Sequence, residues 1–244
     1  MFDPAVYENS VNWEKRLGAE LPFLEAAIGR HESPIVLDAG CGVGRHTAAL
    51  SGKGYDVTGI DSDPAMIAFA KANNGKYADR FTHCPIGNIS SRMGVKYTLI
   101  FMLGNTLPIA AWNNEEAVFS DLFNSLVPGG AVIFQMLNFN RIKKVKELYL
   151  PLRTASSENG VFHHLRSYLY REGRIEMLSS YVYAEGNGYK RSDSLINFSD
   201  LSPKMLYALL GKHGFSRVSA HSGYGGEAFD EQVSDNLVCE CLRL

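Results

Sequence analysis

The apolar positions of the chain up to residue 140 fall into five short runs, separated by segments whose apolar residues recur at helical spacing. The runs cover residues 35–40, 55–61, 80–86, 97–103 and 131–139, and the intervening helices are expected at 45–51, 63–74 and 113–127. Pro128-Gly129-Gly130 is expected to end the last of these helices. Alternation of strand and helix predicts an α/β fold with a doubly wound, mostly parallel sheet and helices on both faces.

The pattern changes after residue 140. Residues 163–198 contain three β-rich runs separated by Arg-Glu-Gly-Arg and Glu-Gly-Asn-Gly, which are typical of turns, so we expect a three-stranded antiparallel insert. A helix is expected at 202–215, capped by Ser202 and ended at Gly214, and is followed by two strands at 216–222 and 236–244. These additions bring the predicted main sheet to seven strands.

The N-terminal segment predicts a separate helical element. Apolar residues recur at helical spacing from Trp13 to Ile28, Asn12 is a suitable N-cap, and Pro22 is expected to kink or divide the helix. We therefore divide the chain into an N-terminal helical lid, a core domain and an antiparallel β insert that covers one side of the core. Their bounds are 1–33 for the lid, 34–140 with 199–244 for the core domain, and 141–198 for the insert.

Composition narrows the classes of protein. A net charge of -2 gives no global basic field for nucleic acid or an anionic membrane. No apolar run reaches the roughly 20 residues of a membrane span, and the first residues do not resemble a secretory signal, so we expect a cytoplasmic protein. The cysteines at 41, 84, 239 and 241 form no Cys-x-x-Cys motif, so neither disulfides nor a structural metal site is expected.

A glycine-rich stretch, VLDAGCGVGRHT at residues 36–47, directly follows the first apolar run. A dinucleotide fingerprint needs a small residue at its third position, where this chain has Arg45 or Thr47 depending on the register. A phosphate loop is also excluded, since no Gly-Lys-Ser/Thr follows. A nicotinamide-dependent oxidoreductase is therefore a remote alternative.

The same stretch resembles the first motif of the class I S-adenosylmethionine-dependent methyltransferases, Asp-x-Gly-x-Gly-x-Gly, and the resemblance covers roughly residues 34 to 140. It implies a Rossmann-like fold and S-adenosylmethionine as cofactor, with Asp38 near the methionine ammonium and Asp61 on the ribose hydroxyls. Met66, in a pattern similar to the family's Asp-x-Ser/Asp-x-x-Met, is expected against the adenine, although plain helix packing also explains it. The implied cofactor-binding residues are Arg16, Asp38, Ala39, Gly40, Gly42, Gly44, Asp61, Ser62, Met66, Ile86 and Leu103.

Two positions depart from the family pattern. Pro85 stands where members usually carry an acid for the adenine amino group, so the backbone N–H of Ile86 and the side chain of Asn88 are the expected replacements. Thr98 stands where an Asp is common before the fourth strand. These departures motivate one alternative, a cofactor-binding regulatory protein without catalysis.

The methyl acceptor is indicated by residues at the ends of the fourth and fifth strands. Leu-Gly-Asn-Thr at 103–106 is similar to Leu-Gly-Asn-Ser in glycine and sarcosine N-methyltransferases, and the double-proline motif of DNA adenine methyltransferases is missing. We therefore predict in-line methyl transfer to a small molecule, with an amine favoured, and nucleic acid or membrane partners are not expected. Asn105, Asn138 and Arg141 are the expected acceptor-orienting residues.

Several assignments around the acceptor stay open. Arg16 of the lid could hold the carboxylate of the cofactor or of an acidic substrate, with Tyr7 and Trp13 as aromatic walls. His163 and His164 suggest a general base, but adjacent residues on a strand point to opposite faces, so at most one can face the site. The basic segment at 141–153 supports RNA or protein methylation as an alternative, although a solvated helix face explains it better. The sequence does not indicate an oligomeric state.

Overall fold

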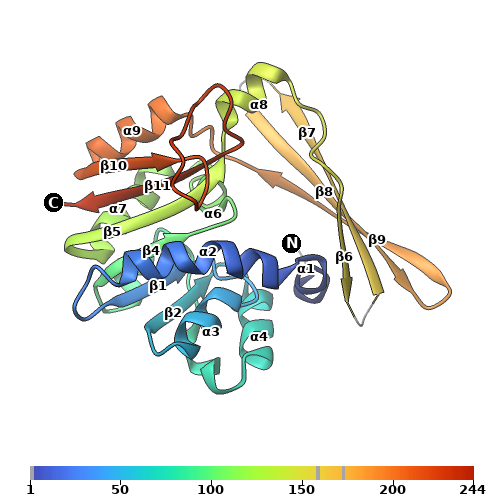
Figure 1. Cartoon of the computed structure of the whole chain (residues 1–244), viewed down its shortest axis with the longest axis horizontal. Helices are drawn as coiled ribbons and strands as arrows, with labels where there is room; N and C mark the ends of the chain where they lie inside the picture. The colour runs from blue at the N-terminus through green and yellow to red at the C-terminus, as the bar shows by residue number, and fades with distance from the viewer. Residues whose placement is uncertain (1–2, 158–159, 172–173) are drawn as a thin grey trace.

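The computed structural model, which describes residues 3–157, 160–171 and 174–244, places a seven-stranded sheet beside a smaller one (Figure 1). The order of the main sheet is β10-β11-β5-β4-β1-β2-β3, with β11 antiparallel to both neighbours and the β1 to β5 pairs parallel. This confirms the predicted doubly wound sheet. Its strands are β1 (Ile35–Ala39), β2 (Asp56–Asp61), β3 (Phe81–His83), β4 (Tyr97–Met102), β5 (Leu126–Leu137), β10 (Phe215–His221) and β11 (Asn236–Arg243).

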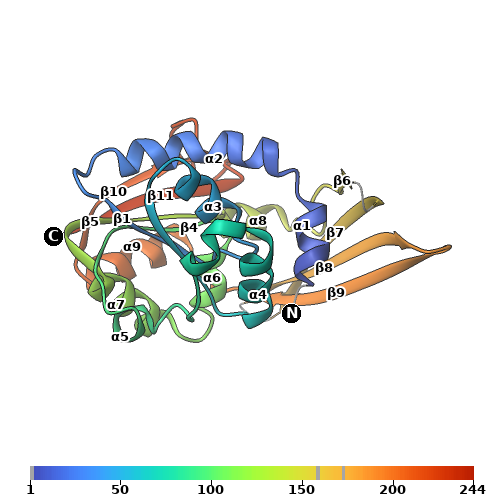
Figure 2. The same ribbon diagram turned by 90° about the horizontal axis from the view of Figure 1, so that it is seen from below.

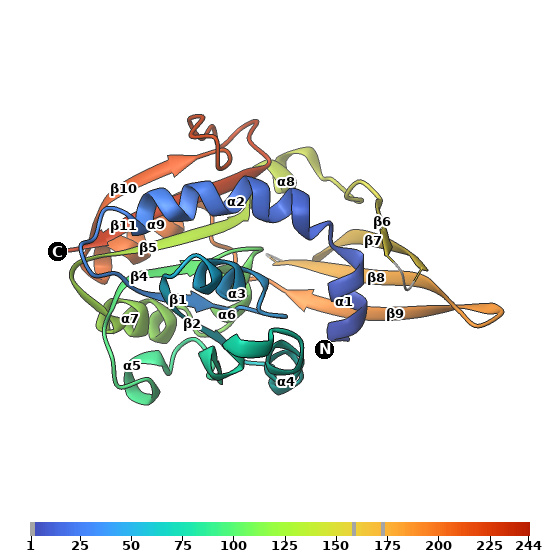
Figure 3. The same ribbon diagram turned by 60° about the horizontal axis from the view of Figure 1, so that its bottom comes forward.

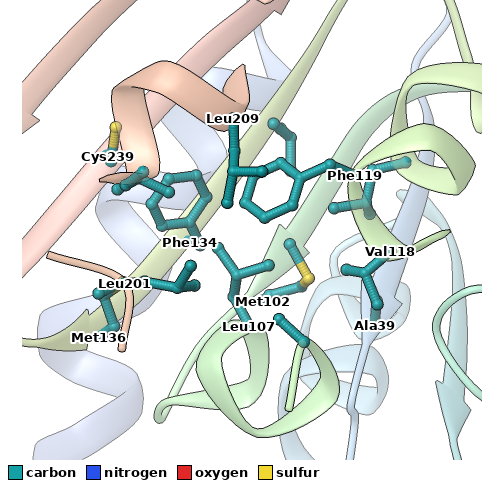
Figure 4. Packing of buried hydrophobic residues seen from close by; sticks show 14 of the residues in the cluster. Ala39, Met102, Leu107, Val118, Phe119, Phe134, Met136, Leu201, Leu209 and Cys239 are labelled. Atoms are coloured by element: carbon teal, nitrogen blue, oxygen red, sulfur yellow. The ribbon is translucent and has the colours of Figure 1, made fainter. Parts of the chain in front are cut away.

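Helices cover both faces because successive strand residues point to opposite sides. In β4, Leu99 and Phe101 belong to one buried cluster, while Ile100 and Met102 belong to the other. The first cluster packs against α2 (Trp13–Ile28) and α3 (Arg45–Gly52). The second includes Phe119 and Leu209 over Phe134 (Figure 4), and it packs against α6 (Thr106–Ala110), α7 (Glu115–Ser125) and α9 (Pro203–Lys212).

The remaining helical elements lie around the edges of the sheet (Figure 2). Among them, α4 begins at Pro64, as the proline at a favourable first position predicts. None of the described helices has the length and apolar character that a membrane crossing requires. These elements are α1 (Pro4–Ser10), α4 (Pro64–Asn73), the 3₁₀ helix η1 (Gly75–Arg80), α5 (Ile89–Arg92) and α8 (Phe139–Val145).

The lid helix confirms the predicted cap and corrects the predicted break. The Asn12 side chain accepts a hydrogen bond from the Lys15 amide at 2.9 Å, as an N-cap should. Pro22 lies inside α2, and the helix continues through it without division. Leu24 and Ile28 beyond the proline are fully buried against the sheet, and this tertiary packing stabilises the helix where propensity alone does not.

The segment Pro128-Gly129-Gly130 does not end a helix, contrary to the prediction. Helix α7 ends at Ser125, and β5 runs through the three residues with a shift in its register against β4. A Cβ on Gly130 would lie 2.9 Å from the Val127 carbonyl oxygen and 3.1 Å from that of Tyr97. The glycine therefore allows β5 to pass close to the backbone of β4.

The smaller sheet has four antiparallel strands, one more than predicted: β6 (Arg153–Ser157), β7 (Gly160–Arg171), β8 (Arg174–Glu185) and β9 (Gly188–Asn197). The additional strand, β6, follows the basic segment and pairs with β7 from Arg153 onward. The predicted turn between β8 and β9 is confirmed by the pairing of Glu185 with Gly188. Residues 172–173 of the other predicted turn lie outside the described residues.

Gly130→Ala should lower the free energy of unfolding by about 1–3 kcal/mol, because the new methyl group meets carbonyl oxygens that cannot move away independently. Gly211→Ala is the matched control: it lies in α9, and a Cβ there meets no atom within 4 Å, so stability should stay equal or rise by up to about 1 kcal/mol. Urea unfolding measures both. Equal stability of the two variants would contradict the close approach of β5 to β4.

Candidate functional site

Three glycines shape the turn from β1 into α3. Gly40, Gly42 and Gly44 have φ values of 85°, 54° and 84°, a left-handed region in which other residues are strained. A Cβ on Gly40 would stand 2.4 Å from the Thr106 side chain, and one on Gly44 would stand 2.6 Å from Phe81. A Cβ on Gly42 would meet only Tyr7, at 3.9 Å, so the middle of the turn has an open side.

Asp61 ends β2 beside this turn. Its Oδ2 accepts a hydrogen bond from the Gly42 amide at 2.9 Å, and its Oδ1 accepts one from the Asp63 amide at 2.8 Å. Burial raises the pKa of Asp61. Met66 on α4 is buried, and the carbonyl of Ser62 accepts a hydrogen bond from the ring of His83 at 3.1 Å. The structure thus brings the predicted glycines and Asp61 together at the carboxyl edge of the sheet.

Asp38 lies beneath the turn. It is 4% exposed, and its Oδ2 accepts a hydrogen bond from the Thr47 hydroxyl at 2.7 Å. Burial raises the pKa of Asp38 to about 6, because removal from water disfavours the ionised carboxylate more than the contacts with His46 and Thr47 stabilise it. Ala39 is fully buried in the core, and Leu103 at the end of β4 is 8% exposed. Asp38, Ala39 and Leu103 are therefore buried residues on which the turn packs.

The loop after β3 is organised by a residue that sequence reasoning missed. Asp121 of α7 is 5% exposed, and its carboxylate accepts hydrogen bonds from the amides of Gly87, Ile89 and Ser90 at 2.7–2.9 Å. The amide of Ile86 is not among its partners. The aspartate lies on an amphipathic helix far along the chain, where it reads as an ordinary polar residue.

Arg16 of the lid reaches the end of β4. Its Nη1 donates a hydrogen bond to the Tyr7 hydroxyl at 2.9 Å, and its Cζ lies 5.3 Å from the centroid of the Trp13 ring. A Cβ on Gly104 would stand 3.2 Å from Arg16 Nη2. The structure therefore gathers the three residues that the sequence suggested for the lid, and it places the guanidinium next to the strand that neighbours β1.

The expected acceptor-orienting residues have contacts within the protein. Asn105 Oδ1 accepts a hydrogen bond from the Leu137 amide at 2.7 Å. Asn138 is 2% exposed, and its Nδ2 donates to the carbonyls of Glu231 and Ser234. Arg141 forms ion pairs with Glu147 and Asp235, both at 3.2 Å. Their contact with an acceptor stays a prediction.

One face of β7 carries polar and titratable side chains. His164 stacks on Tyr181 with ring centroids 4.1 Å apart, and its Nε2 is bonded to the Ser179 hydroxyl. Burial, together with the charges of Arg166 and Arg153, lowers the pKa of His164 to about 3, so the imidazole is neutral at physiological pH. The sequence singled out His164, whereas Arg166 was missed although strand alternation puts it on the same face.

This face of the insert contacts the N-terminal part of the chain. Helix α1 lies between the main sheet and the smaller one (Figure 3), and its Val6 packs against Phe162 and Tyr181. At the other end of β7, the Tyr170 hydroxyl donates hydrogen bonds to carbonyls at Ile142 and Glu147. The stretch of β7 that carries His164 and Arg166 therefore runs between α1 and α8.

Unpartnered polar atoms occur on the same face. The Tyr168 side chain is 2% exposed, and its hydroxyl has no hydrogen-bond partner among the described residues. Arg166 donates from Nη2 to the Pro151 carbonyl, while its Nε is buried without a partner in the described part of the chain.

Residues for metal binding do not gather within the described ranges. No three His, Cys, Asp or Glu side chains there lie close enough to share an ion. The four cysteines are free and buried, with Cys239 and Cys241 on β11 as predicted.

The chain is similar to known methyltransferases. Residues 36–130 match the family model of the methyltransferase domain. A glycine/sarcosine N-methyltransferase of Aphanothece halophytica is 23% identical over 139 residues, which are 56% of this chain and 52% of that protein. The chain thus spans about half the length of the curated relatives it matches.

Solved structures share nearly the whole fold. An S-adenosylmethionine-dependent methyltransferase from Clostridium acetobutylicum superimposes with a TM-score of 0.76 at 16% identity, over 97% of this chain and 94% of its own. CalS10, an amino pentose methyltransferase from Micromonospora echinaspora in complex with S-adenosylmethionine, gives a TM-score of 0.73 at 15% identity, over 98% and 95% of the two chains. The small antiparallel sheet is therefore part of the shared architecture.

The buried carboxyl of Asp38 predicts a pH-dependent stability. Its pKa in the folded protein, about 6, lies above the unfolded value of about 4, so the folded state binds more protons between these values. The wild type should therefore lose stability relative to Asp38→Asn as the pH rises from about 4 to about 6. The loss approaches about 3 kcal/mol if the whole shift acts, at about 1.4 kcal/mol per pH unit.

Urea unfolding of both proteins at pH 4, 5, 6 and 7 measures this difference. Asp56→Asn, at the exposed start of β2, controls for the removal of a carboxylate. A difference between wild type and Asp38→Asn that does not vary with pH would show that Asp38 ionises equally easily in the folded and unfolded chains.

Proposed function

We propose that this protein is a class I S-adenosylmethionine-dependent methyltransferase that methylates the amine of a small molecule by direct in-line displacement, because residues 36–130 match the family model of the methyltransferase domain and the chain has the fold of such an enzyme. The observation that carries the cofactor assignment is the contact between Asp61 and Gly42, which sets an acceptor carboxylate against a turn with an open side. When bound, S-adenosylmethionine supplies a methyl group already activated on a sulfonium.

The residues around the turn fit this cofactor. Asp61 is the acceptor for the ribose hydroxyls, and Met66 borders the adenine. The Ile86 amide is the proposed contact to the adenine ring in place of the acid that Pro85 replaces, and Asp121 keeps that loop in shape. Arg16 Nη2, at the end of β4, is the donor proposed for the cofactor carboxylate.

The acceptor site lies between the core domain, the lid at 1–33 and the insert at 141–198. Methyl transfer from an activated donor mainly requires alignment and exclusion of water, so no catalytic triad is needed. The insert face provides a neutral His164, which can accept a hydrogen bond from the attacking amine, and polar groups of Arg166 and Tyr168. Asn105 and Asn138 fix the backbone at the ends of β4 and β5 through their hydrogen bonds. Arg141 follows Asn138 in the chain and borders the proposed acceptor site.

An amine acceptor is supported by the named relatives. The similarity to a glycine/sarcosine N-methyltransferase and to an amino pentose methyltransferase favours a small amino compound. The basic segment at 141–153 gives limited support to RNA as substrate, because two of its five cations, Arg141 and Lys143, are already paired with carboxylates and Lys144 is bonded to an amide oxygen. Arg141 pairs with Glu147 and Asp235, Lys143 with Asp200, and Lys144 with Gln232.

Calorimetric titration with S-adenosylmethionine, S-adenosylhomocysteine and NAD tests the cofactor. Both sulfur nucleotides should bind with a dissociation constant on the order of micromolar, and NAD should not bind. Asp61→Ala should weaken binding at least about tenfold, which corresponds to about 1.4 kcal/mol. Asp56→Ala, at the other end of the same strand, is the matched control and should bind as the wild type does.

The absence of any binding by the sulfur nucleotides would reject the cofactor assignment. Binding that is unchanged in Asp61→Ala would reject the role of Asp61. Tight binding without turnover of any acceptor would favour the regulatory alternative that Pro85 and Thr98 suggest.

Formation of S-adenosylhomocysteine with paired acceptors tests the acceptor atom. Two pairs of compounds are compared: glycine with glycolate, and an aminopentose with the matching pentose. Within each pair, one compound carries an amine where the other carries a hydroxyl. The amine of a pair should be methylated and the hydroxyl compound should not, because a neutral amine attacks without prior loss of a proton. Preferential methylation of the hydroxyl compound would contradict the proposal.

A further inference from the structure

A buried hydrogen-bonded chain lies behind Arg16. Glu20 is 7% exposed and His46 is 6% exposed, although carboxylates and imidazoles are seldom buried without a partner. The Glu20 carboxylate accepts hydrogen bonds from Arg16 Nε, which lies 3.1 Å from Oε1 and 3.2 Å from Oε2. His46 Nε2 is bonded to Glu20 Oε2, so its N–H donates to the carboxylate. The chain connects α2 with the start of α3.

Burial alone would raise the pKa of Glu20, but the hydrogen bond from His46 and the charge of Arg16 bring it below the ordinary value. Glu20 is therefore ionised at neutral pH. Both oxygens of the Glu20 carboxylate accept hydrogen bonds from the protein, so the buried charge is paired.

These contacts fix the orientation of the guanidinium. Glu20 holds the Nε side, Tyr7 accepts from Nη1, and the Trp13 ring lies 5.3 Å from Cζ. Nη2 has no hydrogen-bond acceptor among the described residues, and it lies 3.2 Å from where a Cβ on Gly104 would stand. A planar guanidinium that is fixed at Nε and Nη1 can direct Nη2 in one direction only.

That direction matches the far end of the proposed cofactor. β1 lies between β2 and β4 in the sheet, so a ligand that crosses the glycine turn reaches Asp61 of β2 at one end and Gly104 after β4 at the other. If Asp61 takes the ribose, the opposite end carries the amino-acid part and its carboxylate. Gly104 has no side chain, so it leaves room for that group beside Nη2.

We infer that Glu20 and His46 are positioning residues that aim Arg16 Nη2 at the carboxylate of the bound adenosyl amino acid. This inference rests on the proposed function, because it requires a sulfonium or thioether nucleoside at the turn. Glu20 and His46 touch no ligand themselves. They act through Arg16.

A pair of ligands separates this role from a general role in folding. S-adenosylhomocysteine carries the carboxylate, whereas 5′-methylthioadenosine keeps the adenosine and sulfur and lacks the amino-acid part. Glu20→Gln should weaken binding of S-adenosylhomocysteine at least about tenfold and change binding of 5′-methylthioadenosine less than about twofold. Glu25→Gln, a partly exposed carboxylate on the same helix that pairs with Lys53, should change neither.

Two further variants keep the test decisive if Glu20→Gln is unstable. His46→Leu should reproduce the selective loss, and His46→Gln, whose amide can donate as Nε2 does, should restore binding. Gly104→Ala leaves the Arg16–Glu20 pair in place but puts a methyl group 3.2 Å from Nη2, so it should also weaken S-adenosylhomocysteine selectively.

Each other outcome overturns the inference. Equal weakening of both ligands in Glu20→Gln and His46→Leu would show a merely structural role. No weakening in these variants would show that Arg16 is oriented without them. A wild type that binds neither ligand would instead reject the proposed cofactor, and the inference would fail with it.

Discussion

The reversal of the chain between β1 and α3 is the constraint on which the rest of the site depends. The amides of Gly40 and Cys41 both donate to the Ile60 carbonyl, at 2.7 and 2.8 Å, so the end of β1 is joined to β2 before the helix begins. The turn is bounded by Thr106 on one side and Phe81 on the other, which leaves no space for side chains at Gly40 or Gly44. The carboxyl ends of three strands are thereby brought together within reach of one ligand.

Buried carboxylates keep the surrounding segments in place. Asp38 accepts from Thr47 and joins β1 to α3, Glu20 joins the lid to the same helix, and Asp121 accepts from three amides of the loop after β3. An unpaired carboxylate in such positions would be costly, so each has its hydrogen-bond donors within the fold. The same groups that stabilise the protein therefore set the geometry around the glycine turn and the loop after β3.

The parts of the fold that local sequence determines were predictable, and those that depend on distant partners were not. The run at 97–103 gives β4 because a doubly covered strand is apolar at nearly every position. Pro128-Gly129-Gly130 reads as a turn, but β5 pairs with β4 on both sides of it, at Leu126 and at Ala131, so the three residues form an irregularity within the strand. β6, with the sequence Arg-Thr-Ala-Ser-Ser, has no apolar alternation. Arg16 and Asp61 followed from family resemblance, whereas Glu20 and Asp121 lie on helices where an acidic residue usually faces solvent.

The place of β11 in the sheet has a consequence for the order of folding. β11 pairs with β5 on one side and β10 on the other, although about 100 residues, including the whole small sheet, separate it from β5. During synthesis β5 therefore presents an unpaired apolar edge until residues 236–243 have left the ribosome. The half of the sheet that holds the glycine turn, β1 to β5, can pair as soon as these neighbouring segments have been made. The other half, β10 and β11, can pair only when the end of the chain has been made.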